Sequence, residues 1–393
     1  MFMKGTILLG CLLFCIVVCS MILPLRTRWW WKMLLCIPVG LVAFKFQVLY
    51  GIWGGHFFRP TVPAWLELAS NWLYMSLLLL AFLLLVWEIL CFPLWFIYRK
   101  KRGELRSFHN GFNLALLLGG PIIIAWGMHQ AFAQPQVREV VINLPELQQP
   151  VRLAMLADLH ADRHKQAPFF REIVARTNAL QADAIVITGD FEDGTVSELA
   201  PALLPLRDLR SRWGTFAVHG NHDYFSGHET WQRYLSGLGI RFLNNEHVLP
   251  GEGHIVLAGV TDPAAARDNC TQPNIPQALA GSPRNKPIIL LCHQPRLARQ
   301  AAQAGVDLQL SGHTHGGHAP GLRQLIAMCN EGLARGLYRI GNTQIYVSNG
   351  TSLWSGFPLR LFTPAEITLI HLMPGSIYLY HVDAKQRSLH DKP

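Results

Sequence analysis

Residues 151–160 read VRLAMLADLH, an apolar run that ends in an Asp-x-His pair, and this pattern decides the fold. A short apolar run is typical of a buried strand, so Asp158 and His160 would lie where that strand ends. The pattern recurs in four further segments: 184–187 precedes Gly189-Asp190, 215–218 precedes Gly220-Asn221-His222-Asp223, 288–292 precedes His293, and 308–311 precedes Gly312-His313-Thr314-His315-Gly316-Gly317. Open α/β sheets collect their sites at strand ends, which predicts an α/β fold with one shared site.

The five segments together offer carboxylate, imidazole and amide oxygen ligands. Mn²⁺, Fe²⁺ and Zn²⁺ accept this mixture. Residues i and i+2 share one face of an extended segment, so Asp158 and His160 are expected to point the same way, as are His313 and His315. A single Asp-x-His is more often an ordinary polar loop, but the five segments in one chain predict a metal centre.

With these motifs the sequence resembles the calcineurin-like metallophosphoesterases, and more narrowly their bacterial membrane-associated members, over residues 137–382. The resemblance extends to Tyr224 after the Gly-Asn-His-Asp motif, to residues 308–317, to Pro358-Leu359-Arg360 and to Pro364-Ala365-Glu366-Ile367. It implies an α/β domain of two packed mixed sheets flanked by helices. The implied activity is two-metal hydrolysis of a phosphoric ester, by a phosphodiesterase or phosphatase.

The resemblance also implies residue roles. One divalent ion would be bound by Asp158, His160, Asp190 and His315, and a second by Asp190, Asn221, His293 and His313, with Asp190 bridging the two. His222 would be the general acid, oriented by Asp223, while a metal-activated water attacks phosphorus. The ions could be Mn²⁺, Fe²⁺ or Zn²⁺. Glu192 and His318 stand where relatives commonly have an apolar residue and Gln, which bears on substrate preference.

From residue 137 onward, strand-like and helix-like segments alternate, which predicts a metallophosphoesterase domain over residues 137–383 and a polar tail over 384–393. An opening strand is expected at 137–144, with helices at 168–180, 197–210, 229–238 and 295–304 and a strand-rich end at 344–348, 366–372 and 377–382. Residues 263–287 are loop-like, and we expect this long loop to lie over or near the site.

The first third of the chain is apolar enough to lie in a membrane. Half of all residues are hydrophobic and only 15% are charged. Within residues 1–134 we expect transmembrane spans near 6–25, 29–53, 72–97 and 112–128, since crossing the apolar core takes about 20 residues. The fourth span is short and contains Pro121. A secretory signal is the alternative for the first, but its apolar run exceeds the usual length of about 7 to 15 residues.

Basic residues set the expected orientation, because Lys and Arg near span ends stay in the cytoplasm. The loops after the first and third spans contain eight of them, against three on the opposite side. The N-terminus and the C-terminal domain would then face the periplasm or cell exterior. The net charge of +9 fits anionic lipid headgroups. No basic stripe with interleaved aromatics is present, so no nucleic-acid partner is expected.

The link from residue 128 to residue 137 is short, so the domain would lie close to the bilayer. Phospholipids or lipid-linked phosphates are therefore expected substrates, with soluble nucleotides or phosphodiesters as rivals. A different class of function is a catalytically silent metal-binding sensor or scaffold coupled to the spans. An extracytoplasmic domain would also permit a disulfide between Cys270 and Cys329.

Overall fold

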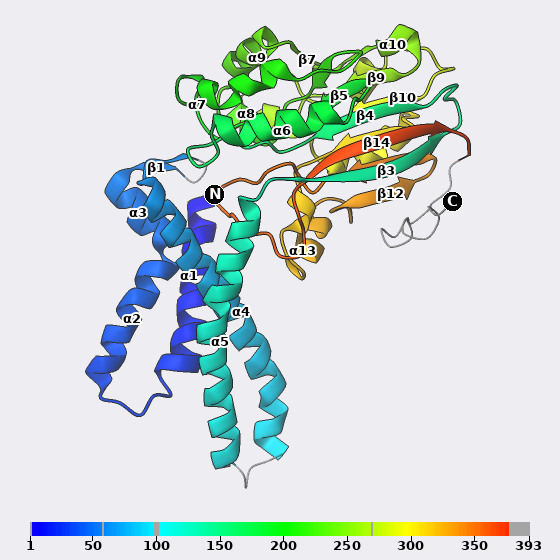
Figure 1. The fold of residues 1–393 in the computed structure, drawn as a ribbon. Helices are drawn as coiled ribbons and strands as arrows, with labels where there is room; N and C mark the ends of the chain where they lie inside the picture. The colour runs from blue at the N-terminus through cyan, green and yellow to red at the C-terminus, as the bar shows by residue number, and fades with distance from the viewer. Residues whose placement is uncertain (1, 57–58, 98–101, 269, 377–393) are drawn as a thin grey trace, which may run out of the picture.

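The computed structural model describes residues 2–56, 59–97, 102–268 and 270–376. Apolar helices form an N-terminal bundle, and a two-sheet α/β domain lies at one end of it (Figure 1). The fold class expected from the sequence is confirmed. The strand expected at 377–382 and the polar tail lie outside the described residues.

The bundle contains α1 (Phe2–Val17), its π-helical continuation Val18–Ile22, α2 (Trp29–Ala43), α3 (Lys45–Trp53), α4 (Ala64–Ile97) and α5 (Arg102–Ala131). Three segments are long and apolar enough to cross a membrane: Lys4–Ile22, Ala64–Pro93 and Asn110–Ala131. The helices α2 and α3 make a fourth only if they count as one span, because they are bent by 71°. A two-stranded ribbon, β1 (Gly55–His56) with β2 (Arg59–Pro60), follows α3.

The domain is built on two six-stranded mixed sheets. The first sheet has the order β3 (Gln136–Leu144), β14 (Glu366–Pro374), β4 (Val151–Leu156), β5 (Ala184–Ile187), β6 (Thr215–Ala217) and β7 (Ile240–Phe242). The second has the order β12 (Gly336–Ile340), β13 (Thr343–Val347), β11 (Leu308–Ser311), β10 (Ile288–Leu291), β9 (Val256–Gly259) and β8 (Glu246–Val248). The strands β4 to β7 run parallel, as do β9, β10, β11 and β13.

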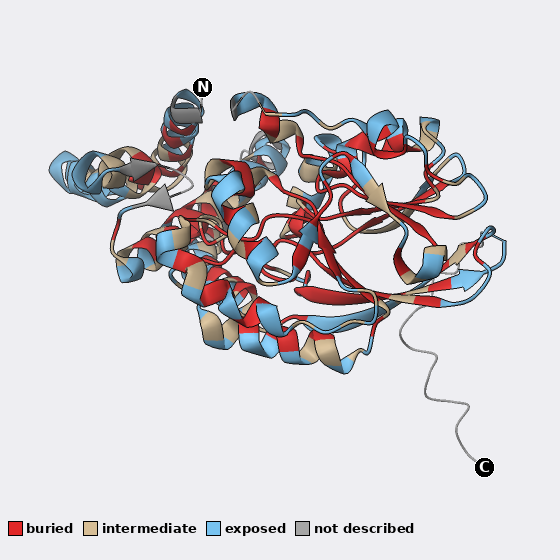
Figure 2. Cartoon of the chain, turned by 90° about the horizontal axis from the view of Figure 1, so that it is seen from above, coloured by how far each residue is buried: buried red, intermediate tan, exposed pale blue. Residues whose placement is uncertain are grey.

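Both faces of the central strands are buried, which explains why their sequences are continuous apolar runs. On β4, Leu153 and Met155 face the second sheet and pack with Leu291 of β10, while Ala154 and Leu156 face helices. Those helices are α6 (Ala167–Ala179), α7 (Val196–Leu203) and α9 (His228–Gly237). Figure 2 shows the buried strands at the centre of the domain, between partly exposed helices. The strand ends therefore lie on a rigid framework.

Two expected helices begin or end in 3-10 turns at prolines. The helix expected at 197–210 is α7 followed by the 3-10 turn Leu204–Asp208, because Pro205 lacks the N–H that would continue the α-helix. The helix expected at 295–304 opens with the 3-10 turn Pro295–Leu297 before α12 (Ala298–Gln303). These differences leave the strand ends in place.

The segment expected as a long loop, 263–287, contains the 3-10 helix Pro263–Asp268 and α11 (Ile275–Ala278). The Arg267 guanidinium lies 4.9 Å from the ring centre of Phe225, in the short helix α8 (Asn221–Phe225) that follows β6. The segment therefore lies beside the expected site. The structure forms no disulfide between Cys270 and Cys329; the Cys270 Sγ instead lies 3.7 Å from His228 Nε2.

The domain rests on α4 and α5 through an apolar cluster. Ala319 and Leu359 of the domain pack with Met75 of α4 and Ile124 of α5. The backbone N–H of Arg360 donates to the carbonyl of Gly127 at 3.0 Å, and a Cβ at Gly127 would lie only 2.6 Å from Leu359 Cδ1. A side chain at Gly127 would therefore require Leu359 and Leu361 to shift from their present positions.

Candidate metal centre

The carboxyl ends of five strands meet at one place and bring the predicted segments together. In the first sheet, β4 leads to Asp158 and His160, β5 to Asp190, and β6 to Asn221 and His222. In the second sheet, β10 leads to His293, and β11 leads to His313 and His315. Because the sheets pack face to face, these two rows of side chains face each other across one site.

Three groups of side chains have the composition and spacing of metal ligands; one of them, His160 with Asp193 and His222, shares His160 with another, and the other two consist of residues that the resemblance implied as ligands. Ligand atoms of Asp158, His160 and His315 lie within 4.8 Å of one another, and so do those of Asp190, His293 and His313. Asn221 belongs beside the second group, because its Oδ1 lies 3.2 Å from His293 Nε2. All seven side chains that the resemblance implied as ligands thus lie in one site.

Asp190 lies between the two groups. Its Oδ2 is 3.2 Å from His293 Nε2 in one group and 3.6 Å from His160 Nε2 in the other. Its Oδ1 accepts a hydrogen bond from the His222 backbone N–H at 2.8 Å. A Cβ at Gly220 would lie 2.2 Å from Asp190 Oδ1, so only glycine fits opposite this carboxylate.

The backbone at these ligands is left-handed, and this corrects the expected reason for their convergence. Five of them have positive φ: Asp158 (54°), His160 (44°), Asp190 (57°), His313 (72°) and His315 (49°). Residues i and i+2 therefore do not point together by sharing a face of an extended strand. Their side chains converge because tight turns at the strand ends adopt a conformation that non-glycine residues rarely take.

Several ligand atoms are buried in the orientation that a cation requires. Within the described part of the chain, His160 Nε2 and His315 Nδ1 are buried and make no hydrogen bond. The Nδ1 of His293 lies 2.7 Å from the carbonyl of Thr188, so its N–H donates there and Nε2 is left to face Asp190. Such outer hydrogen bonds fix the tautomer of metal-binding histidines. The residues present fit divalent cations.

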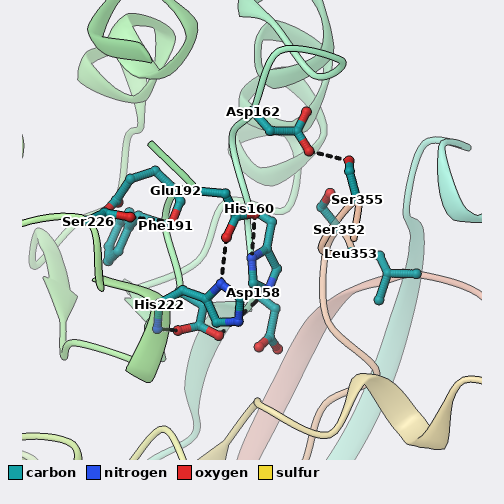
Figure 3. Close-up of polar contacts among 12 residues, drawn as sticks. Asp158, His160, Asp162, Phe191, Glu192, His222, Ser226, Ser352, Leu353 and Ser355 are labelled. Atoms are coloured by element: carbon teal, nitrogen blue, oxygen red, sulfur yellow. Dashed lines mark hydrogen bonds and ion pairs between the residues drawn. The ribbon is translucent and has the colours of Figure 1, made fainter. Parts of the chain in front are cut away.

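In the structure, the carboxylate that contacts the His222 ring belongs to Asp193 and not, as the resemblance had implied, to Asp223. Asp193 Oδ1 lies 2.5 Å from His222 Nδ1, and its Oδ2 lies 3.1 Å from His160 Nδ1. The Asp223 carboxylate instead accepts hydrogen bonds from the backbone N–H groups of Gly220, Asp190 and Phe191. Asp223 therefore fixes the loops that bear the ligands. Figure 3 shows His160 and His222 side by side at this point.

The charges around His222 favour its protonated form. Burial alone would lower the pKa of His222, but the carboxylates of Asp190 and Asp193 outweigh burial and raise the pKa to about 9. The reverse holds for His313, where burial lowers the pKa to about 3 and favours the neutral imidazole that binds metals. Burial next to Asp223 and Asp193 raises the pKa of Glu192 well above its usual value. Burial would also lower the pKa of His293, but the carboxylates of Asp190 and Asp158 raise it to about 10.

A loop that the sequence did not single out, residues 349–356, closes one side of the site. The backbone N–H groups of Thr351 and Ser352 donate to the carbonyls of Ala157 (2.6 Å) and Asp158 (3.1 Å). The Trp354 ring lies 5.6 Å from the His222 ring, centre to centre. The buried Arg360 donates to the carbonyls of Gly350 and Ser352, which explains why the Pro358-Leu359-Arg360 motif accompanies the metal motifs.

The calcineurin-like phosphoesterase family model matches residues 151–317, the range that contains every predicted ligand. A metallophosphoesterase of Helicobacter pylori (strain J99 / ATCC 700824) is 36% identical over 282 residues, which cover 71% of this chain and 74% of the relative. A transmembrane protein with metallophosphoesterase domain from Danio rerio is 33% identical over 359 residues, covering 87% of this chain and 80% of that protein. So large a share of this chain includes part of its apolar N-terminal third.

The fold and the clustered ligands define a metal-dependent phosphoester hydrolase domain joined to apolar helices. The chain belongs to the calcineurin-like metallophosphoesterase family. Its apolar helices and its transmembrane relatives identify it as a membrane protein.

Asp193→Asn is predicted to lower kcat for an aryl phosphodiester by about 10- to 100-fold, because it removes the carboxylate that orients both His222 and His160. Steady-state kinetics with added Mn²⁺ measure the change. The matched control is Asp208→Asn, because its carboxylate lies on the surface and is 60% exposed. Equal kcat values for the two variants would contradict the role assigned to Asp193.

Proposed function

We propose that this protein is a membrane-anchored phosphoesterase that hydrolyses its substrate with two metal ions and with His222 as general acid. The observation that carries the proposal is the position of Asp190, whose Oδ2 faces a histidine of each ligand group. A shared carboxylate of this kind is what two adjacent cations need. A site for a single ion would leave one of the two groups without a function.

Asp158, His160, Asp190 and His315 would hold one ion, and Asp190, Asn221, His293 and His313 would hold the other. Ions held there would supply Lewis-acid chemistry, since they would activate a water for attack on phosphorus and neutralise charge on the phosphoryl oxygens. The candidate ions are Mn²⁺, Fe²⁺ and Zn²⁺, which accept this ligand mixture.

The remaining task is to protonate the leaving oxygen, and His222 suits it. Asn221 already supplies a ligand from the same turn, so His222 is left for proton transfer. The hydrogen bond between Asp193 Oδ1 and His222 Nδ1 directs Nε2 away from Asp193 and favours the protonated ring. A positioned histidine of this kind contributes roughly 10²- to 10⁴-fold in rate.

The rival function is a silent metal-binding sensor or scaffold. Such a protein needs its ligands but has no use for a further imidazole, outside the ligand set, that a buried carboxylate holds beside them. The buried pairing of His222 with Asp193 therefore favours catalysis over the rival. Hydrolysis of an aryl phosphodiester with added Mn²⁺ separates the two classes.

Two variants test the roles of His222 and Asp190. His222→Ala is expected to retain metal and to lose about 10²-fold or more in kcat, because only proton transfer is removed. Asp190→Ala is expected to lose both metal and turnover, because both ligand groups lose the carboxylate between them. Elemental analysis and turnover of an aryl phosphodiester are measured on the same preparations. Retained turnover in Asp190→Ala would overturn the assignment.

We propose a phosphoester at the membrane surface, such as a phospholipid or a lipid-linked phosphate, as the substrate class. The loops that border the site also contact the bundle: Asn71 of α4 donates through Nδ2 to the carbonyl of Ser355 at 2.8 Å, one residue after Trp354. Glu67 of α4 pairs with Arg163 (3.4 Å) and His164 (3.1 Å), which follow the Asp158 motif. The site therefore lies close to the ends of the spans.

Lipid and soluble substrates are separated by a direct comparison in mixed micelles. The purified full chain is predicted to hydrolyse a phospholipid or lipid-linked phosphate with a higher kcat/KM than a water-soluble diester at equal phosphoester concentration. Phosphate release and headgroup release are measured with the same metal supplement. A soluble diester far exceeding every lipid tested would reject the proposed substrate class and leave the proposed hydrolysis intact.

We further propose that the domain faces the periplasm or cell exterior. The proposal rests on the excess of Lys and Arg in the loops after the first and third spans. The loop of residues 23–28 and the end of α4 lie at the end of the bundle opposite the domain, and the N-terminus lies at the domain end (Figure 1).

A reporter fused after Pro393 tests this orientation. Alkaline phosphatase is expected to be active at that position and a fluorescent protein dark, because alkaline phosphatase requires export. The same reporters fused within residues 98–101 should give the opposite result. If the fluorescent protein fused after Pro393 is bright and alkaline phosphatase at the same position is inactive, the domain lies in the cytoplasm.

A further inference from the structure

The helix α13 (Leu322–Met328), which follows the last metal motif, exposes an apolar surface that the proposed hydrolysis does not use. Leu325 is 60% exposed and Met328 78% exposed, and Phe362 in a neighbouring loop is 73% exposed. Residues 318–330 contain no Asp or Glu. Large apolar side chains grouped in this way on a protein surface mark a contact with a partner or a membrane.

The surface formed by Leu325, Met328 and Phe362 lies beside the transmembrane helices. Leu322, at the start of α13, packs in the cluster that joins Met75 of α4 and Ile124 of α5 to the domain. The Phe362 ring lies 5.6 Å from the ring of Trp126 in α5. Trp126 is five residues before the end of the span Asn110–Ala131, or about 7 Å along the helix axis. In Figure 1, α13 extends from the domain toward the bundle.

The same surface continues onto the exposed apolar side of α5. Trp126 is 42% exposed, and its neighbours Ile122 and Ile123 are 70% and 46% exposed. Phe362 therefore lies against the exposed outer side of the bundle, next to Trp126. This continuity favours lipid as the occupant. A second copy of the chain that covered this surface from the aqueous side would also have to cover the apolar face of a membrane span.

Two arginines border the surface. Arg323 of α13 is exposed, and Arg335 donates through Nη1 to the Phe362 carbonyl at 3.4 Å. Apolar side chains flanked by cations are typical of helices that lie in the headgroup region, with their apolar face about 5 to 10 Å deep. The arginines would then lie level with lipid phosphates.

We propose that α13 and Phe362 insert into the bilayer leaflet next to the domain, with lipid as the occupant of this surface. The element is fixed to the metal motif: a Cβ at Gly317 would lie 2.5 Å from the Arg323 Cα, and the His318 ring lies 5.3 Å from His315. Insertion of α13 would therefore set the height of the metal centre above the membrane. The proposal stands apart from the reaction that the site performs.

The test is photocrosslinking of the full chain in nanodiscs of phosphatidylethanolamine and phosphatidylglycerol. Met328→p-benzoylphenylalanine and, separately, Leu325→p-benzoylphenylalanine are expected to form phospholipid adducts, measured by mass spectrometry of the tryptic peptides. The positive control places the probe at Phe82, which is 60% exposed on α4. The negative control places it at Leu249, which is 47% exposed beside α10 (Pro250–Gly253), far from the bundle (Figure 1).

Lipid adducts at 325 and 328 at least tenfold above those at 249 would support insertion. Adducts at 82 without any excess at 325 and 328 would overturn it. Crosslinks from 325 or 328 to a second copy of the chain, in place of lipid, would also overturn it and assign the surface to self-association. Both probed positions are exposed, and unchanged binding of Mn²⁺ by each variant shows that the domain is folded.

Discussion

The site depends on one constraint: two sheets must hold five strand ends in place, three of them against an unfavourable backbone. Five ligand residues adopt left-handed φ values, and each such residue costs on the order of 1 to 3 kcal/mol. The core between the sheets supplies the opposing stabilisation, since Leu153, Met155 and Leu291 are fully buried there. A ligand turn can relax only if its strand moves, and each strand is fixed on both faces.

Burying several carboxylates close together is also unfavourable, and the fold must compensate for it. Asp158, Asp190 and Asp223 are nearly or completely buried, and the side chain of Asp193 beside them is only 4% exposed. Backbone N–H groups offset part of this repulsion at Asp223, and histidines offset another part at Asp193 and Asp190. Asp158 receives the backbone N–H of His313, yet burial still raises its pKa. The remaining excess of negative charge is the condition that divalent cations satisfy.

The segments that bear the ligands could be predicted from the sequence because each follows an apolar run, and such runs identify strand ends. The family resemblance implied that His222 is oriented by Asp223, its neighbour in the chain. Asp193 comes from a different strand end and meets His222 only when β5 and β6 lie side by side. The loop of residues 349–356 contains no Asp, Glu, His or Cys to mark it, and its role depends on hydrogen bonds to Ala157 and Asp158, just after β4. The left-handed turns at Asp158 and His160 could not be foreseen either, because they arise from packing rather than from residue type.

The contacts between domain and bundle involve the same loops that border the site. Lys165 is buried, pairs with Asp162 at 2.8 Å and donates to the carbonyl of Leu353 at 2.7 Å, so it ties the segment after His160 to the loop of Trp354. Ser355 bonds to Asp162 and accepts from Asn71 of α4 through its carbonyl (Figure 3 shows the Asp162–Ser355 bond). Buried polar contacts therefore connect α4 to the loop of Trp354, whose ring lies 5.6 Å from the ring of His222. The domain and the membrane helices are thus joined by these polar contacts as well as by the apolar cluster that contains Met75 and Ile124.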